Sequence, residues 1–241
     1  MKELLAGIVM VPGVVAGLLY AVFAYLYHLS REAYFRAWKT GWGAYCLYYA
    51  LITLNFYTSQ SAIVYLVANL LLVGMALCIF ASTRLMERSF FAPSRSVERS
   101  FRLQRSDVML GAGLVALAIW NLWAHFDHGV FRLDVERHRY LRLEVGVGIL
   151  LAFCGYRFYR YARQRDSVGF WLLSASLAVW SALLGFRQFH SVFEQLFGQF
   201  GHFLGPIPQM LLGIGMLMVL FENERRVVQE NALAFSTLEV N

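Results

Sequence analysis

The sequence has little charge and almost no lysine. Only 15% of its 241 residues are charged, whereas soluble domains carry about 25%. Hydrophobic residues make up 59%, and the mean hydropathy is +0.53. Lys2 and Lys39 are the two lysines, against nineteen arginines. These values exclude an ordinary soluble domain and indicate a polytopic membrane protein.

The sequence also lacks the patterns of common catalytic sites. It contains no G-x-S-x-G, H-E-x-x-H or P-loop motif. A retinal Schiff base needs a lysine inside an apolar run, and Lys39 lies only at the edge of one. The longest loop has about twenty residues, which is too short for a catalytic domain. We therefore assign no catalytic residue and expect that this chain is not an enzyme.

Cysteine is scarce and has no ligand spacing. Cys46, Cys78 and Cys154 each lie inside an apolar run, far apart in sequence. A lone thiol in such a run is typical of a small buried hydrophobic residue. We expect all three to be buried free thiols.

Seven apolar runs reach the roughly 20 residues that a bilayer requires. The sequence therefore predicts an all-α, seven-transmembrane helix bundle. The expected spans are approximately Leu4–Leu29, Trp38–Tyr57, Ala62–Met86, Val108–Phe126, Leu141–Arg160, Val168–Phe189 and Phe203–Phe221.

Basic residues are unevenly divided between the two sides of this bundle. Six lie on the side of the N-terminus, namely Lys2, Arg132, Arg137, Arg139, Arg142 and Arg187. The other fifteen are Arg31, Arg36, Lys39, Arg84, Arg88, Arg95, Arg99, Arg102, Arg105, Arg157, Arg160, Arg163, Arg165, Arg225 and Arg226. Cytoplasmic loops of membrane proteins are enriched in Lys and Arg. We expect the N-terminus outside and the C-terminus in the cytoplasm, in a bacterial inner membrane. The basic loop 84–105 is expected to contact lipid headgroups and not nucleic acid.

The third and seventh spans align without gaps, which suggests an internal repeat. Residues 69–84, NLLLVGMALCIFASTR, match residues 210–225, MLLGIGMLMVLFENER, at six positions. Trp38 and Trp171 correspond loosely in the second and sixth spans. A three-plus-one-plus-three plan would give two halves of the same orientation, related by an axis along the membrane normal.

A layer of polar and aromatic residues is predicted at the outer ends of the helices. Ionisable residues at such positions are candidates for function, because leaving them in lipid is costly. The layer could form a pocket for a small polar or anionic ligand, or sense pH through histidine. His125, His128, His190 and His202 could also hold a metal or haem, and histidine and tryptophan are ordinary interfacial residues. The candidate ligand-binding residues are Trp123, His125, His128, Glu144, Arg187, His190 and His202. We expect no cofactor.

The last span continues into a charged tail without proline or glycine. We expect residues 1–221 to form the bundle and residues 222–241 a cytoplasmic signalling helix. Phe221, Val228 and Phe235 recur every seven residues, and Glu224, Asn231 and Leu238 follow each by three. Such a heptad stripe is typical of a parallel coiled coil, here with polar seam positions. Phe221, Val228, Asn231, Phe235 and Leu238 are the candidate signal-output residues of a homodimer.

The chain resembles the seven-helix input region of bacterial membrane sensors. The resemblance rests on the topology, on the first loop LSREAYFRAWKTGW (residues 29–42) and on ENERRVVQENALAFSTL (residues 222–238). In that family the region precedes a histidine-kinase or diguanylate-cyclase module, so the resemblance implies a cytoplasmic effector. The sequence stops at Asn241 without such a module, and we expect it to be the sensor part of a longer protein.

These observations predict a membrane receptor for a two-component or related system. It would detect a small-molecule or lipid signal at its outer face or within the membrane, and transmit it through the seventh helix. Two alternatives remain at this point. One is a small-solute transporter of the three-plus-one-plus-three plan, and the other is a metal or haem protein that uses the outer histidines.

Overall fold

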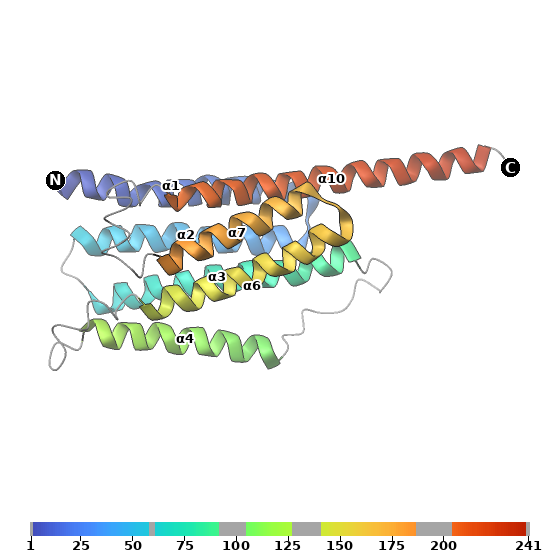
Figure 1. Cartoon of the computed structure of the whole chain (residues 1–241). Helices are drawn as coiled ribbons and strands as arrows, with labels where there is room; N and C mark the ends of the chain where they lie inside the picture. Colours follow the sequence, from blue (N-terminus) through green and yellow to red (C-terminus); the bar gives the residue numbers. More distant parts are fainter. Residues whose placement is uncertain (1, 58–60, 92–104, 127–140, 187–203, 240–241) are drawn as a thin grey trace.

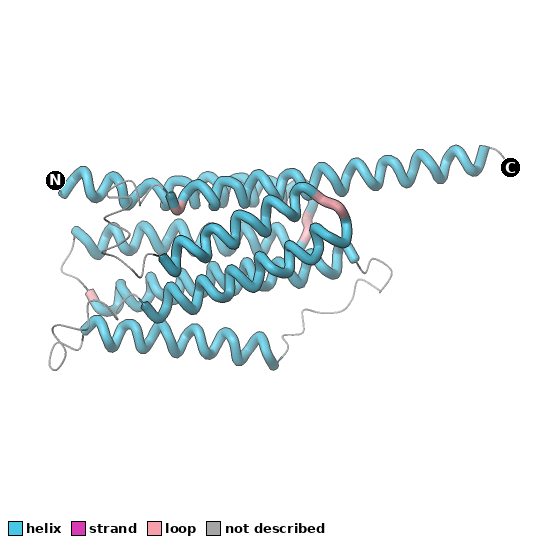
Figure 2. Tube along the Cα trace, viewed as in Figure 1, coloured by secondary structure: helices cyan, strands magenta, loops and turns pink. Residues whose placement is uncertain are grey.

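The computed structural model describes residues 2–57, 61–91, 105–126, 141–186 and 204–239. These ranges form seven helices and contain no strand (Figure 2). The helices are α1 (Lys2–Ser30), α2 (Ala33–Tyr57), α3 (Ala62–Phe91), α4 (Arg105–Phe126), α6 (Leu141–Arg165), α7 (Val168–Phe186) and α10 (Pro206–Glu239).

The predicted helices are confirmed, with differences at their ends. Helices α3 and α6 each run five residues past the predicted end of their span, to Phe91 and Arg165, because a helix continues into water beyond the apolar run that defines a span. Four helices, α1, α3, α7 and α10, are long and apolar enough to cross a membrane. Helix α4 has a shorter apolar stretch, Val108–Trp120. Helix α2 is richer in Tyr and Trp, and helix α6 is richer in Tyr and Arg. The chain is thus a helical protein with at least four candidate membrane spans.

Helices that follow one another in the chain run antiparallel, and they form two sequential groups of three (Figure 1). In the first group α2 packs against α1 and α3, and in the second α7 packs against α6 and α10. The groups meet where α3 contacts α6 and where α1 contacts α10. Helix α4 lies at one side, against α3 and α6. If α1, α2 and α3 correspond to α6, α7 and α10, the two contacts between the groups are equivalent.

Aromatic side chains fill the centre of the bundle. Trp38 and Trp42 of α2 and Trp180 of α7 are each at most 2% exposed. The rings of Trp42 and Trp180 stack at a centroid distance of 5.9 Å and an interplanar angle of 3°. Buried aromatic pairs of this kind contribute about 1 kcal/mol beyond their area. This stack joins the middle helices of the two groups.

The second group contains a very close approach of two backbones. A Cβ atom added at Gly169 of α7 would lie 2.5 Å from the backbone nitrogen of Val219 in α10. Since Cβ atoms essentially never approach that closely, only glycine fits this position. The beginning of α7 is therefore held directly against the final helix.

Both groups join their first two helices by a tight turn with a positive φ. Arg31 follows α1 with φ of 58°, and Asp166 follows α6 with φ of 47°. A serine hydroxyl accepts a nearby backbone N–H in each turn, Ser30 from Glu32 and Ser167 from Phe170. The turns therefore share a positive φ at the residue after the first helix, a cation in one and an acid in the other, but their serines lie on opposite sides of that residue and accept different N–H groups.

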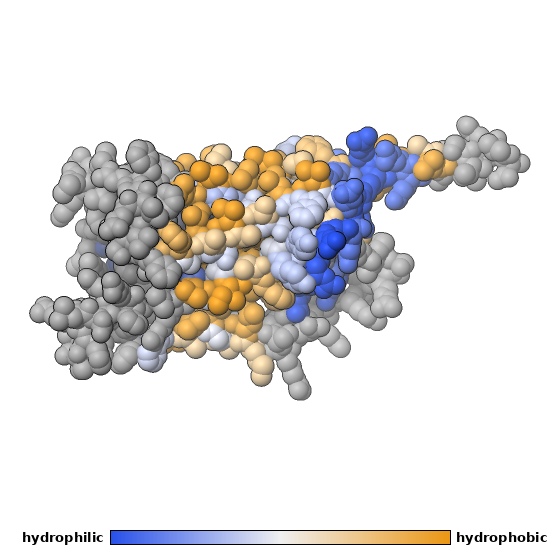
Figure 3. Space-filling view, viewed as in Figure 1, coloured by the Kyte–Doolittle hydropathy of each residue, from blue (hydrophilic) through white to orange (hydrophobic). Residues whose placement is uncertain are grey.

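Helix α10 is continuous from Pro206 to Glu239 and projects far beyond the other helices (Figure 1). Pro206 and Pro208 lie in its first turn, where a missing N–H costs no helical hydrogen bond. The helix therefore begins at these prolines without a break. Figure 3 shows a hydrophobic belt followed by a hydrophilic band where α10 leaves the bundle.

Candidate functional site

The predicted outer layer falls mostly outside the described residues. His128, Arg187, His190 and His202 lie there entirely. Trp123 and His125 belong to α4, but their side chains are outside the described part, and Glu144 is half-buried in the first turn of α6. The layer therefore remains a prediction.

The predicted output stripe lies on α10. Phe221 is 64% exposed and Val228 is 66% exposed, and Asn231 is also exposed. Phe235 and Leu238 belong to the same helix, with side chains outside the described part. The heptad positions that the structure describes thus share an open face.

The cysteine prediction holds fully for one residue. Cys154 is completely buried, whereas Cys46 and Cys78 are half-buried. All three are free thiols. Cys46 and Cys78 lie nearer to the lipid-facing surface than expected, because an apolar run also supplies the outward face of a helix.

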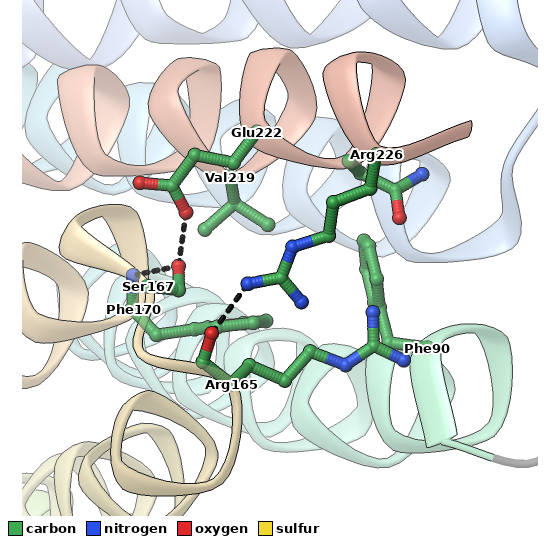
Figure 4. Close-up of a pocket in the computed structure, with 8 residues that line it drawn as sticks. Phe90, Arg165, Ser167, Phe170, Val219, Glu222 and Arg226 are labelled. Carbon is green, nitrogen blue, oxygen red and sulfur yellow. Dashed lines mark hydrogen bonds between the residues drawn. The ribbon is translucent and has the colours of Figure 1, made fainter. Parts of the chain in front are cut away.

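A polar junction joins α10 to the turn between α6 and α7 (Figure 4). The carboxylate of Glu222 accepts hydrogen bonds from the Ser167 hydroxyl and from the backbone N–H of Gly169, the latter at 3.2 Å. The Ser167 hydroxyl oxygen accepts the N–H of Phe170 at 3.2 Å. Ser167 is therefore the N-cap of α7, and Glu222 supplies a second acceptor to the same helix end.

The charge of Glu222 suits this position. The first N–H groups of a helix have no partner within the helix and carry a partial positive charge. A carboxylate there satisfies one donor and gains an electrostatic term of about 0.3–1 kcal/mol. Glu222 belongs to another helix, so this stabilisation is available only while α10 holds its place beside α7.

Arg226 makes a second contact one turn further along α10. Its guanidinium donates to the backbone carbonyl oxygen of Arg165, which belongs to the last turn of α6. The Arg165 side chain lies over the ring of Phe90 at 5.7 Å, so the end of α3 takes part as well. Burial and the nearby Arg226 guanidinium lower the pKa of Arg165 from its ordinary value. Four helices thus meet where α10 leaves the bundle.

The cleft between these side chains is a contact and not a ligand site. Its volume is about 10 Å³, which is room for about one water molecule. Its lining residues are Phe90, Arg165, Ser167, Phe170, Val219, Glu222, Asn223 and Arg226. What this arrangement can do is couple the position of α10 to the α6–α7 turn.

A second polar contact lies near the other end of α10. Gln209 is 1% exposed, and its Nε2 donates to the hydroxyl oxygen of Tyr45 at 3.1 Å. Tyr45 and Tyr49, one turn apart on α2, share a further hydrogen bond of 3.1 Å. The Oε1 atom of Gln209 and the Nε1 atom of Trp42 are buried with no hydrogen-bond partner among the described residues. Helix α10 is therefore tied to the first group by side chains that can still pair with a neutral hydrogen-bonding group.

An ion pair links the two groups on their other contact. Arg157 of α6 pairs with Glu87 of α3 and donates to the Thr83 hydroxyl at 3.3 Å. The hydroxyl of Tyr161 donates to the same carboxylate at 3.0 Å. The Glu87 side chain is 49% exposed, so the pair itself contributes about 1 kcal/mol or less.

Sequence reasoning did not identify the junction. In the sequence, Glu222 and Arg226 are two of several charged residues in the tail. Glu222 immediately follows the apolar run, so its side chain can reach back to the bundle. Ser167 directly before the apolar run of α7 is a recognisable N-cap signal. No sequence pattern indicates which carboxylate joins that cap.

Comparisons with protein-family models, with characterised proteins and with solved structures found no match for this chain. Among the described residues, no three His, Cys, Asp or Glu side chains are grouped as a metal site would require. That statement does not cover the side chains of the four predicted histidines, which lie outside the described part: His125, His128, His190 and His202. The geometry of α10 is therefore the main basis for a functional proposal.

Proposed function

We propose that this chain is the sensor region of a bacterial membrane signalling protein, with α10 as its output helix. The observation that carries the proposal is the continuity of α10. One helix is buried against α7 at Leu212, Met216 and Val219, and it is exposed beyond the bundle at Val227 and Val228. A helix without a break transmits rotation or translation from one part to the other.

The polar contacts of α10 give this helix two anchors. The Glu222 carboxylate and the Arg226 guanidinium hold it to the α6–α7 turn, and Gln209 holds it to α2. A signal can shift α10 only if it changes the free-energy difference between two arrangements of these contacts. We expect the signal to act at the outer ends of the helices or at the buried Gln209–Tyr45 pair. It would be a small molecule or a lipid.

The membrane placement in this proposal has seven spans. Helices α2 and α6 have 25 residues each, or about 37 Å at 1.5 Å per residue, and they run beside the four apolar helices. The described basic residues at the ends of α1, α3 and α6 gather at the end where α10 emerges (Figure 3). This favours a cytoplasmic tail. The equivalent contacts of the two groups support the three-plus-one-plus-three repeat.

The proposed receptor is a homodimer through α10. Ile207, Met210 and Ile214 are each about half exposed. Ile207 and Ile214 continue the heptad position of Phe221 and Val228 into the bundle, and Met210 continues that of Glu224 and Asn231. Lipid can cover the first three residues but cannot cover Val228 in water. A second copy of α10 in parallel covers the whole stripe.

The test uses the chain with a reporter histidine-kinase module joined after residue 241. Inserting one alanine between Arg226 and Val227 rotates the tail by about 100° without touching the anchors. We expect this insertion to change kinase output strongly. Inserting seven residues at the same point restores the phase to within about 20° and should preserve output. Equal output from both insertions would rule out transmission through the phase of α10.

A transporter is the second candidate, because the equivalent contacts α3–α6 and α1–α10 also suit a two-fold transport path. Purified chain in proteoliposomes should then give flux of small solutes, whereas a receptor gives none. The two functions are separated by this assay together with the insertion pair.

A further inference from the structure

At the end of α1, two cations lie over one aromatic ring. The Arg31 guanidinium carbon lies 5.9 Å from the centroid of the Tyr27 ring, and the Lys39 ammonium lies 5.0 Å from it. Arg31 follows α1, and Lys39 belongs to the second turn of α2. The two charges therefore lie at most about 11 Å apart, so one anion between them can attract both.

The backbone holds Arg31 in this place. Its φ of 58° is in the left-handed region, which is unfavourable for a residue with a side chain. Its N–H donates to the carbonyl oxygen of Tyr27 at 2.9 Å and so closes the end of α1. The turn therefore fixes the backbone from which the Arg31 side chain extends over the Tyr27 ring.

No carboxylate neutralises the pair. Among the described residues, neither Arg31 nor Lys39 forms an ion pair with an acidic side chain. Glu32 is next in sequence and exposed, and its carboxylate forms no ion pair with Arg31.

The end of α6 has a contact of the same kind with one cation. Arg163 lies over the Tyr159 ring at 5.9 Å, and the ring of Trp171 makes an edge contact with Tyr159 at 5.2 Å. Among the described residues, two cations lie over one ring at Tyr27, whereas Phe80, Phe90 and Tyr159 each carry one.

An apolar seam leads from the two cations along the bundle surface. Tyr20 of α1 is 43% exposed and packs over Gly43 of α2, where an added Cβ atom would lie 3.2 Å from the tyrosine ring. Leu47, one turn further along α2, is 57% exposed. Since the apolar span of α1 ends at Ser30, the cations lie at the level of lipid headgroups and the seam lies at the level of acyl chains.

We propose that Arg31, Lys39 and Tyr27 bind the phosphate of an anionic membrane phospholipid, with an acyl chain along Tyr20, Gly43 and Leu47. The two cations supply charge-assisted hydrogen bonds to the phosphate, and the anion between them attracts both. This site depends on the membrane placement and is independent of any signalling role, so its failure and that of the proposed function are distinguishable.

The test measures lipid binding to the purified full chain by native mass spectrometry, with phosphatidylglycerol and phosphatidylcholine as probes. The first phosphatidylglycerol should bind more tightly than phosphatidylcholine. The double variant Arg31→Gln/Lys39→Gln should weaken phosphatidylglycerol binding by roughly 30-fold, as two basic residues at a membrane surface predict. Binding of phosphatidylcholine should change little.

The matched control is Arg36→Gln/Arg163→Gln, which removes two exposed cations from the same end of the bundle. It should leave the preference for phosphatidylglycerol nearly intact. Equal losses in the two double variants would show a general charge effect and would overturn the site. Displacement of the lipid by inorganic phosphate would also overturn it, because the site would then bind a free anion. If the double variant does not fold, the single variants should each weaken phosphatidylglycerol binding by roughly fivefold.

Discussion

Replacing Glu222 with alanine should loosen the start of α7, although Glu222 belongs to α10. The substitution removes the acceptor of the Gly169 N–H, and Gly169 is a buried residue. An unpaired buried donor costs about 1–3 kcal/mol, and loss of the charge at the helix end costs about 0.3–1 kcal/mol. The Ser167 hydroxyl still accepts the N–H of Phe170, so the cap survives in part. We expect a net cost of about 2 kcal/mol for opening this turn.

Hydrogen–deuterium exchange of the purified chain in nanodiscs measures this cost locally. A cost of about 2 kcal/mol corresponds to roughly 30-fold faster exchange of the Gly169 amide. Glu222→Gln keeps an acceptor oxygen but loses the charge, and should give a cost of about 1 kcal/mol and roughly fivefold faster exchange. The control is Glu230→Ala, which removes an exposed carboxylate two turns further along α10. The reasoning is refuted if Glu222→Ala and Glu230→Ala give the same exchange at Gly169.

Two further predictions address the packing of α10 and its open face. Gly169→Ala should lower the free energy of unfolding by about 1–3 kcal/mol or more, because the added methyl would overlap the backbone of Val219. In the control Gly74→Ala the added methyl meets nothing within 4 Å, so this variant should be neutral or stabilising. Thermal unfolding of the two variants compares their stabilities. Val228→Cys should form a disulfide between two copies under mild oxidation, because Val228 lies on the heptad stripe of the proposed dimer. Gln229→Cys, the next position around the helix, should cross-link far less. Equal cross-linking of the two variants on non-reducing gels would contradict the proposed dimer interface.

The positions of the helices could be predicted because the apolar runs are long and clearly bounded. Tyr57 and Ala62 were expected as the end of one span and the start of the next, and α2 and α3 end and begin there. Helix α10 was expected to continue into the tail, since residues 222–241 contain neither proline nor glycine. The number of membrane spans was harder to predict from the sequence. Helices α2 and α6 carry aromatic and basic residues that a bundle interior accommodates, so hydropathy alone does not identify them as spans.

The junction could not be predicted, because its contacts depend on tertiary structure. Glu222 and Ser167 lie 55 residues apart, and several carboxylates of the tail have the same local sequence character. Only the close approach of α7 and α10, which Gly169 permits, selects Glu222. The stack of Trp42 on Trp180 has the same origin, since each tryptophan by itself resembles any aromatic residue of a span.

The most direct test of the central claim measures whether α10 is one rigid helix held by its anchors. Spin labels are placed at residues 163 and 233 of a chain whose three native cysteines are replaced, and the distance between them is measured by pulsed electron paramagnetic resonance in nanodiscs. The proposed output helix predicts one narrow distance distribution, which becomes broad or shifts in Glu222→Ala. A broad distribution in the parent chain, or one that Glu222→Ala leaves unchanged, would contradict the claim that the junction sets the position of the tail.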